Sequence, residues 1–458
     1  MLNFLKQVFW TSLITNISSV ASFIGIAFLA RYISPETFGI YIFCLAAKEI
    51  ISSICAPSLS QTYLFSNGTL SDFKKVCKIN SLYSFLILIV SIIGAFIVKE
   101  KYGNLYFDII IIFGILSILN NYSSIFLSIG EKKMNFKKTS FIRSSSLVIS
   151  LVSTCFFAIF LGDNLIVLVI KEIIFSSLLF LSSLTFYFKF KNEKKIKSDN
   201  DLKYLFKYSL RSYFPKVTET FSYKIFDLLT AGFLGKNILG LFNQTLNIVK
   251  IPYKFLGSVT DNILFVHIKN NKKKEIIDDF NLIQNLIILF NIPIILFINL
   301  FDYEIVSIIL GAKWLKSADI IALLSIFLII LPFYNSLITV YQSSDNQRYY
   351  TSVNCLVLFF QILGVLTLPK SIDIFILIYC TSFLLGTVFL SFNINKNIGF
   401  DRKRLLNILL SIITIFSLIV SYYYLKLNIC LFILIFIWIY LLMKNKTVFL
   451  LIMKKWKN

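Results

Sequence analysis

Apolar runs of about twenty residues recur along the whole chain, and each is bounded by a short polar or charged segment. As an α-helix, such a run is long enough to cross the hydrocarbon core of a bilayer. The pattern therefore predicts an all-α polytopic membrane protein with about 14 transmembrane helices. Their expected limits are residues 8–30, 39–65, 79–98, 107–129, 143–161, 165–188, 209–234, 238–264, 281–301, 317–341, 352–369, 372–393, 405–425 and 427–443.

The composition supports a membrane protein and argues against a nucleic-acid-binding one. Of the 458 residues, 57% are hydrophobic and only 15% are charged, which leaves no room for a separate soluble domain. The net charge of +22 comes largely from lysines and arginines in the loops between the apolar runs. We attribute this charge to membrane topology and expect no nucleic-acid partner.

Basic residues are concentrated in every second loop, and this distribution places those loops in the cytoplasm. The alternate loops hold few basic residues, so both termini are expected to be cytoplasmic. The basic loops include Lys74, Lys75, Lys78, Lys132, Lys133, Lys137, Lys138, residues 189–211, Lys269, residues 272–274, residues 402–404 and residues 444–457.

The longest hydrophilic segment divides the apolar runs into two sets. We expect a six-helix lobe over residues 1–188, a cytoplasmic basic linker over 189–208, a second six-helix lobe over 209–400, and two extra helices with a cytoplasmic tail over 401–458. A sequence echo supports two pseudo-symmetric lobes. Residues 31–41 (RYISPETFGIY) and 232–242 (GFLGKNILGLF) each join two spans, and Gly39 aligns with Gly240.

The seventh predicted span is unusually polar for a transmembrane helix. Lys216, Glu219, Tyr223 and Asp227 fall within an arc of about 100° on a helix, with Lys224 at its edge. Ionisable groups at membrane depth normally face a bundle interior or a watery cavity. This span is therefore the first candidate for a substrate path. The alternative is that these charges pair with one another at i,i+3 spacing or extend to the interface.

Three other predicted spans carry charged residues. In the eighth, Asn247, Lys250 and Lys254 lie on one narrow face. The second contains Lys48–Glu49, and the sixth repeats this dipeptide as Lys171–Glu172. Adjacent residues point about 100° apart on a helix, so neither dipeptide is expected to form an ion pair by itself. We expect Lys48 and Glu49 to line a cavity, and Lys171 and Glu172 to lie nearer the outer packing surface.

Three sets of residues then carry a resemblance to a known family. They are residues 30–41 (ARYISPETFGIY), Asp227 followed by residues 232–242, and residues 304–319 (EIVSIILGAKWLKSAD). Over nearly its whole length the chain resembles the Wzx-type polysaccharide flippases of the MOP exporter superfamily. The resemblance implies two six-helix bundles related by a pseudo-twofold axis, two C-terminal helices, and alternating access in the bacterial inner membrane.

The resemblance also implies a substrate, namely an undecaprenyl-pyrophosphate-linked oligosaccharide repeat unit for O antigen of lipopolysaccharide or for capsule. Its partners would be membrane lipids, a polysaccharide polymerase and a chain-length regulator. The residues suit this substrate, because lysines can pair with the pyrophosphate while amide and phenol groups bind sugar hydroxyls. The expected cavity residues are Lys48, Lys216, Lys224, Lys250, Lys254, Asn247 and Tyr223.

Carboxylates near these lysines have two possible roles. Glu49, Glu219 and Asp227 either tune the lysines or carry a coupling ion, H⁺ or Na⁺. No cofactor, metal site or catalytic group is expected, since the cysteines show no CxxC spacing and His267 is the only histidine. The chain contains no GxxxxGK[ST] sequence, so transport would draw on an ion gradient or on downstream consumption of the product.

Three rival interpretations remain. A MATE-type drug exporter has the same fold but should favour net acidic charge in its cavity, whereas lysines outnumber carboxylates in these spans. A lipid II flippase would favour arginine in the first span, where this chain has Asn16. A membrane glycosyltransferase or O-antigen polymerase would need a sizeable outer loop, and the predicted outer loops are short.

Overall fold

The computed structural model describes residues 2–57, 59–66, 69–191, 206, 209–210, 213–253, 273–343, 347–398, 402–425 and 428–444. Within these ranges every regular element is a helix, as the apolar pattern predicts. The chain divides into two compact units, residues Met1–Asn243 and Gln244–Asn458. The expected lobe boundary at the basic linker, residues 189–208, stays a prediction.

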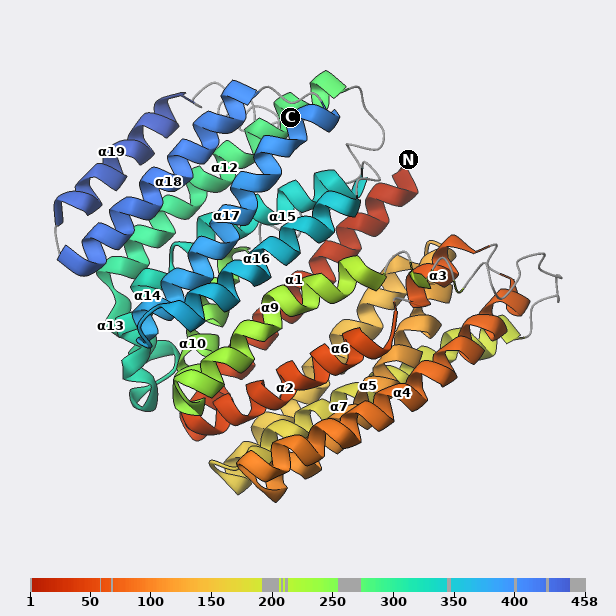
Figure 1. Ribbon diagram of the computed structural model, residues 1–458. Coiled ribbons are helices and arrows are strands. Elements are labelled where there is room, and N and C mark those ends of the chain that lie inside the picture. The colour runs from red at the N-terminus through yellow and green to blue at the C-terminus, as the bar shows by residue number, and fades with distance from the viewer. Residues whose placement is uncertain are drawn as a thin grey trace. The chain divides into compact units, whose positions relative to one another are not determined.

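The first unit consists of long helices connected by tight turns (Figure 1). Within it, α1 packs against α6, α4 against α5, α5 against α7, and α2 against α9. The helices are α1 (Leu2–Tyr32), α2 (Pro35–Cys55), α3 (Leu59–Phe65), α4 (Leu70–Tyr102), α5 (Asn104–Lys132), α6 (Phe136–Leu161), α7 (Leu165–Lys191), α9 (Tyr213–Phe233) and the first turns of α10 (Lys236–Val249).

Local sequence sets both ends of α2. The hydroxyl of Ser34 caps the helix by accepting the Thr37 backbone N–H at 3.4 Å, and Pro35 occupies the first turn. The helix ends at Cys55 because Ala56, which precedes Pro57, is held in extended backbone geometry. The single span expected over residues 39–65 was therefore wrong: it is two helices, α2 and α3.

Helices α2 and α10 approach each other through the two glycines that the sequence echo aligned. A Cβ on Gly39 would lie 1.8 Å from the Lys236 carbonyl oxygen, and a Cβ on Gly240 would lie 1.8 Å from that of Pro35. Gly39 thus faces the carbonyl that lies one helical turn before Gly240, and Gly240 faces the carbonyl that lies one turn before Gly39. Only glycine allows backbones to pack this closely, so the echo marks a reciprocal helix contact.

Large apolar side chains are exposed on the outer faces of the first unit. Phe85 and Phe96 on α4, and Phe156 and Phe160 on α6, are all more than half exposed. Water-soluble proteins rarely display so much contiguous apolar surface. This distribution is typical of helices that face lipid, and it supports a multi-pass membrane protein.

The second unit contains two sharply bent helix pairs. Helices α12 and α13 meet at 85°, and the segment through α14 meets α15 at 56°. Trp314 lies between the two bends and is fully buried. The Trp438 indole N–H of α19 donates a hydrogen bond to the Leu289 carbonyl of α12 at 3.0 Å. The elements are α12 (Lys273–Leu300), α13 (Asp302–Ile309), η1 (Ala312–Ser317), α14 (Ala318–Leu324), α15 (Phe327–Ser343), α16 (Gln347–Thr367), α17 (Ile372–Ile398), α18 (Arg402–Leu425) and α19 (Asn428–Lys444).

The number of membrane spans agrees roughly with the sequence prediction. By length and composition, 9 of the described helices can cross a membrane, and the number rises to 11 if each bent pair is one span. The other three expected spans coincide with α9, α10 and α19. Helix α9 is long enough but polar, α10 is described over only 14 residues, and α19 is a shorter apolar helix.

Candidate functional site: a charged cavity in the first unit

A cavity of about 450 Å³ lies among α2, α5, α7 and α9 of the first unit. This volume is within the range of small-molecule sites in proteins. Its wall combines charged groups, amides and hydroxyls with few apolar side chains. The lining residues are Tyr41, Leu45, Lys48, Glu49, Ser52, Ser53, Ser117, Asn120, Asn121, Lys171, Glu172, Phe175, Lys216 and Thr220.

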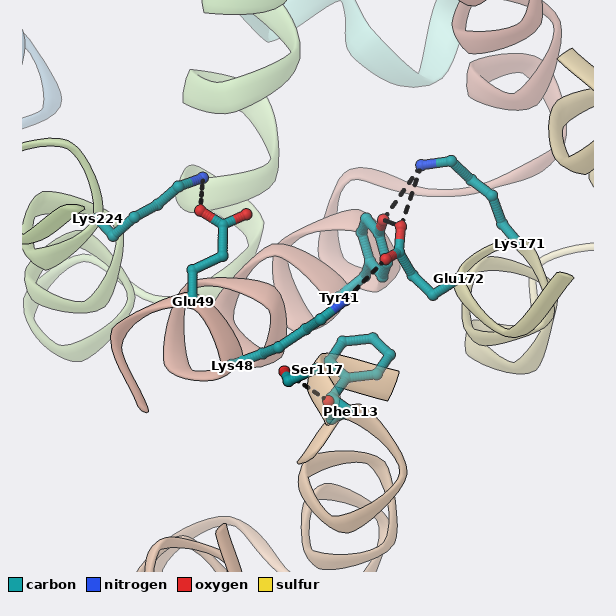
Figure 2. A network of polar contacts seen from close by, with 8 residues as sticks. All are labelled: Tyr41, Lys48, Glu49, Phe113, Ser117, Lys171, Glu172 and Lys224. Atoms are coloured by element: carbon teal, nitrogen blue, oxygen red, sulfur yellow. Dashed lines mark hydrogen bonds and ion pairs between the residues drawn. The ribbon is translucent and has the colours of Figure 1, made fainter. Parts of the chain in front are cut away.

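Glu172 is the centre of a buried polar network on one wall of this cavity. Its carboxylate accepts hydrogen bonds from Lys48 Nζ at 3.0 Å and from the Tyr41 hydroxyl at 2.8 Å. Lys171 Nζ lies 3.6 Å from the same carboxylate and 3.2 Å from the Tyr41 oxygen. Figure 2 shows the two lysines reaching Glu172 from two sides. One buried negative charge is thus shared by two positive charges.

The Lys48 side chain is held firmly in this network. It is only 8% exposed, and its ammonium lies 5.2 Å from the centre of the Phe113 ring. A buried charge is tolerated only when it is paired and hydrogen-bonded. Glu172 meets that requirement for Lys48, and the Phe113 ring adds a cation–π contact.

A second ion pair joins α2 to α9 (Figure 2). Lys224 Nζ lies 3.3 Å from Glu49 and 3.9 Å from Asp227, one turn farther along α9. Asp227 in turn accepts a hydrogen bond from the Asn243 side-chain amide at 2.8 Å. Glu49 lines the cavity, whereas Lys224 and Asp227 lie behind it. This pair is more exposed than the Lys48–Glu172 pair, since the Glu49 side chain is 40% exposed.

Lys216 completes the charge distribution. Within the described part of the chain it forms no ion pair, although Glu219 on the same helix acts on it electrostatically. Three lysines and two glutamates line the cavity, so its net charge is +1. Lys48 and Lys171 both pair with Glu172, and Glu49 pairs with Lys224, so Lys216 is the lining lysine that has no ion pair among the described residues. The cavity therefore favours an anionic ligand.

Some predicted site residues come together here and others do not. Lys48, Glu49 and Lys216 line the cavity, and Lys224 and Asp227 adjoin it through Glu49. Glu219 and Tyr223 lie on α9 but outside the lining. Asn247 and Lys250 belong to the second unit, where the Lys250 ammonium lies 5.4 Å from the centre of the Phe327 ring. Lys254 lies outside the described residues.

Sequence reasoning underestimated Lys171 and Glu172. They line the cavity instead of an outer surface, and they lie 3.6 Å apart, so this adjacent pair does interact. The repeated Lys-Glu dipeptide was the available signal, because the two copies pair across helices as Lys48 with Glu172. Tyr41 was also missed as a site residue, although it precedes Lys48 by two helical turns and shares its face.

No cluster of three or more metal-ligating side chains is found in the part of the chain that the structure describes. Two buried amide atoms, Asn120 Oδ1 and Asn121 Nδ2, have no hydrogen-bond partner there. Buried polar atoms without partners are uncommon in native proteins. These two are therefore available to a polar ligand.

Residues 28–319 match the model of a family described as polysaccharide biosynthesis protein, which is more than half of the chain. No curated protein sequence matches the chain.

Solved structures of membrane transporters share this fold. The match to a structure of the lipid II flippase MurJ in an inward closed conformation covers 98% of this chain and 99% of the MurJ chain, with a TM-score of 0.63 and 15% sequence identity. The match to an inward-facing multidrug resistance MATE transporter of the MOP superfamily covers 83% of this chain and 95% of the transporter chain, with a TM-score of 0.61 and 11% sequence identity. At these identities the likeness establishes the fold alone.

A third structure, of a MOP superfamily transporter from Pyrococcus furiosus described by the reverse polarity of its binding pocket, covers 90% of this chain and 96% of its own, with a TM-score of 0.54 and 12% identity. The chain therefore has the MurJ- and MATE-like fold that the sequence predicted.

Proposed function

We propose that this chain, which belongs to the polysaccharide biosynthesis protein family, is a flippase for a lipid-linked oligosaccharide. The proposed substrate is an undecaprenyl-pyrophosphate-linked repeat unit of O antigen or capsule. It would move from the cytoplasmic to the outer leaflet of the bacterial inner membrane by alternating access. The observation that carries the proposal is the net positive cavity in which Lys216 forms no ion pair with any residue that the structure describes.

The chemistry of the substrate explains why such a cavity is needed. A pyrophosphate cannot enter hydrocarbon unaided, because removing its charges from water is very unfavourable. An ammonium group offers charge-assisted hydrogen bonds that are roughly twice as strong as neutral ones. Lys216 would bind the pyrophosphate first, while the polyprenyl tail remains in lipid.

Glu172 has a distinct role in this proposal. Its single negative charge offsets half of the positive charge of Lys48 and Lys171, which would otherwise be two like charges at short range. When the pyrophosphate enters, these lysines can contact it without leaving their places, because each ammonium has three donors. Glu172 thereby keeps both lysines oriented towards the substrate.

Charge separates this proposal from drug export. A cationic drug would be repelled by a cavity of net charge +1, whereas an anionic headgroup is attracted. A lipid II flippase would carry a substrate with the same pyrophosphate headgroup, so this alternative differs in what is attached to the pyrophosphate. Peptidoglycan precursor and O-antigen unit are thus distinguished by measuring which lipid-linked glycan accumulates.

The orientation and energy source belong to the same proposal. In this proposal both termini lie in the cytoplasm, which the distribution of basic residues among the loops supports. Asp227, which contacts Lys224 and Asn243, is the proposed carrier of a coupling ion, H⁺ or Na⁺. A polysaccharide polymerase and a chain-length regulator would act on the flipped product.

The test measures lipid-linked glycans in cells that lack this protein. The cells are complemented with wild type, with Lys216→Glu, which changes the cavity charge from +1 to −1, or with Lys78→Glu as a control on an exposed lysine outside the cavity. We expect the undecaprenyl-linked unit to accumulate without the protein and with Lys216→Glu. Unchanged lipid-linked glycans together with raised sensitivity to cationic drugs would replace the proposal with drug export.

A further inference from the structure

A second cavity of about 310 Å³ lies among α1, α5, α6 and α7 in the same unit. Asn120 and Phe175 line both cavities, so the two adjoin each other. The polar residues of the second lining are Thr15, Ser18, Asn120, Ser124, Arg143 and Ser144, and Phe175 with three leucines forms its apolar part. This chemistry differs from that of the first cavity.

The second cavity carries no uncompensated charge. Arg143 is the charged residue of its lining, and its guanidinium donates to Glu131 at 2.8 Å. The Arg143 side chain is also 52% exposed, which places it at a solvent-accessible edge. Among the residues that the structure describes, no lysine or carboxylate lines this cavity. An anion would therefore gain little here compared with the first cavity.

The hydroxyls of the lining present acceptors, because their own protons are already used. Thr15 Oγ1 donates to the Thr11 carbonyl at 2.9 Å, Ser18 Oγ to the Thr15 carbonyl at 2.8 Å, and Ser124 Oγ to the Asn121 carbonyl at 2.8 Å. Each hydroxyl oxygen keeps at least one lone pair that can accept, including Ser18 Oγ, which already accepts from Ser144 Oγ at 3.2 Å. Asn120 Oδ1 is a further buried acceptor without a partner among the described residues.

A ligand for this cavity must combine several neutral donors with an apolar face. The donors would satisfy the hydroxyl and amide oxygens, and the apolar face would pack on Phe175 and the leucines. A sugar ring has both features, since its hydroxyls donate and the C–H groups on its faces are apolar. A drug-like cation or a fatty acyl chain has at most one of them.

We propose that the second cavity binds the first sugar of the lipid-linked glycan, while the pyrophosphate occupies the first cavity. The inference rests on the proposed function and adds a neutral saccharide subsite to it. Asn120 and Phe175 lie where the headgroup joins the glycan. This subsite would determine the specificity for the sugar that is attached to the pyrophosphate.

The experiment compares two probes on the full chain in lipid nanodiscs: a polyprenyl pyrophosphate, and the same lipid bearing one N-acetylhexosamine. Two or three additional hydrogen bonds should make the sugar-bearing probe bind about tenfold more tightly to wild type. Ser18→Leu, which fills the cavity, should abolish this gain and leave the affinity for the bare lipid unchanged. Ser124→Ala, which removes one acceptor without adding bulk, should lower the gain about threefold.

The matched control is Ser19→Leu. Ser19 neighbours Ser18 on α1 and also donates to the Thr15 carbonyl, at 2.9 Å, but it lines neither cavity. It should keep the full gain. Equal wild-type affinity for both probes, or an equal loss for both in Ser18→Leu and Ser124→Ala, overturns the saccharide subsite alone. A wild-type protein that binds neither probe overturns the proposed function, and the subsite with it.

Discussion

The Lys48 ammonium lies 3.0 Å from the Glu172 carboxylate, although 124 residues separate the two in sequence. This contact joins α2 to α7 in the wall of a cavity that also contains Lys171 and Lys216. Both side chains are nearly buried, so each charge depends on the other for compensation. The pair leads to predictions for both stability and transport.

The first prediction concerns the loss of Glu172. Glu172→Gln leaves the Lys48 charge buried without a counter-charge, so we expect the free energy of unfolding to fall by about 3–5 kcal/mol. Thermal unfolding of the purified protein in detergent measures this change. The double variant Lys48→Met/Glu172→Leu should recover part of the stability, because an apolar pair of similar volume avoids the desolvation penalty, although Lys171, which is 25% exposed, still lacks its carboxylate. A double variant no more stable than Glu172→Gln alone would contradict the electrostatic explanation.

The second prediction concerns the more exposed pair of Glu49 and Lys224. With Glu49 40% exposed, water and salt screen the interaction, and Glu49→Gln should lower the free energy of unfolding by less than about 1 kcal/mol. The same thermal assay checks this, and the effect should shrink further in high salt. A loss as large as that of Glu172→Gln would mean that the pair is buried in the folded protein.

The third prediction concerns the contact of α2 with α10. Gly39→Ala or Gly240→Ala would place a methyl group 1.8 Å from a backbone carbonyl oxygen. The helices must then separate, and overpacking of this kind lowers stability by about 1–3 kcal/mol or more. The control is Gly232→Ala on α9, where no described atom apart from the neighbouring backbone of the same helix lies within 4 Å of the added carbon. We expect that variant to be neutral or slightly stabilised, and equal losses in all three variants would exclude the close contact as the cause.

The sequence predicted the membrane class and most helix positions well, because burial in lipid imposes long apolar runs. The prediction of helix limits was wrong where a short local sequence ends a helix inside an apolar run. Ala56 before Pro57 breaks one expected span into α2 and α3, and the bend after Leu324 divides the span expected over residues 317–341. Such breaks depend on backbone geometry and tertiary packing, which a hydropathy pattern does not contain.

The candidate site was predicted in part for a similar physical reason. Helical periodicity placed Lys216, Lys224 and Asp227 near one face of a single helix, and two of these residues do interact. Pairing between helices depends on which faces meet, so the partnership of Lys48 with Glu172 could not be derived from either helix alone. The second unit's Asn247 and Lys250 remain predictions.

The most direct test of the account measures flipping by the purified protein. A fluorescent polyprenyl-pyrophosphate sugar is reconstituted with the protein in liposomes, and the initial rate of translocation is compared among wild type, Lys216→Ala, Lys216→Arg and the control Lys78→Ala. Loss of one charge-assisted contact should slow Lys216→Ala by at least about tenfold, while Lys216→Arg keeps most of the rate and Lys78→Ala matches wild type. Translocation by Lys216→Ala at the wild-type rate would contradict the claim that this lysine binds the anionic headgroup.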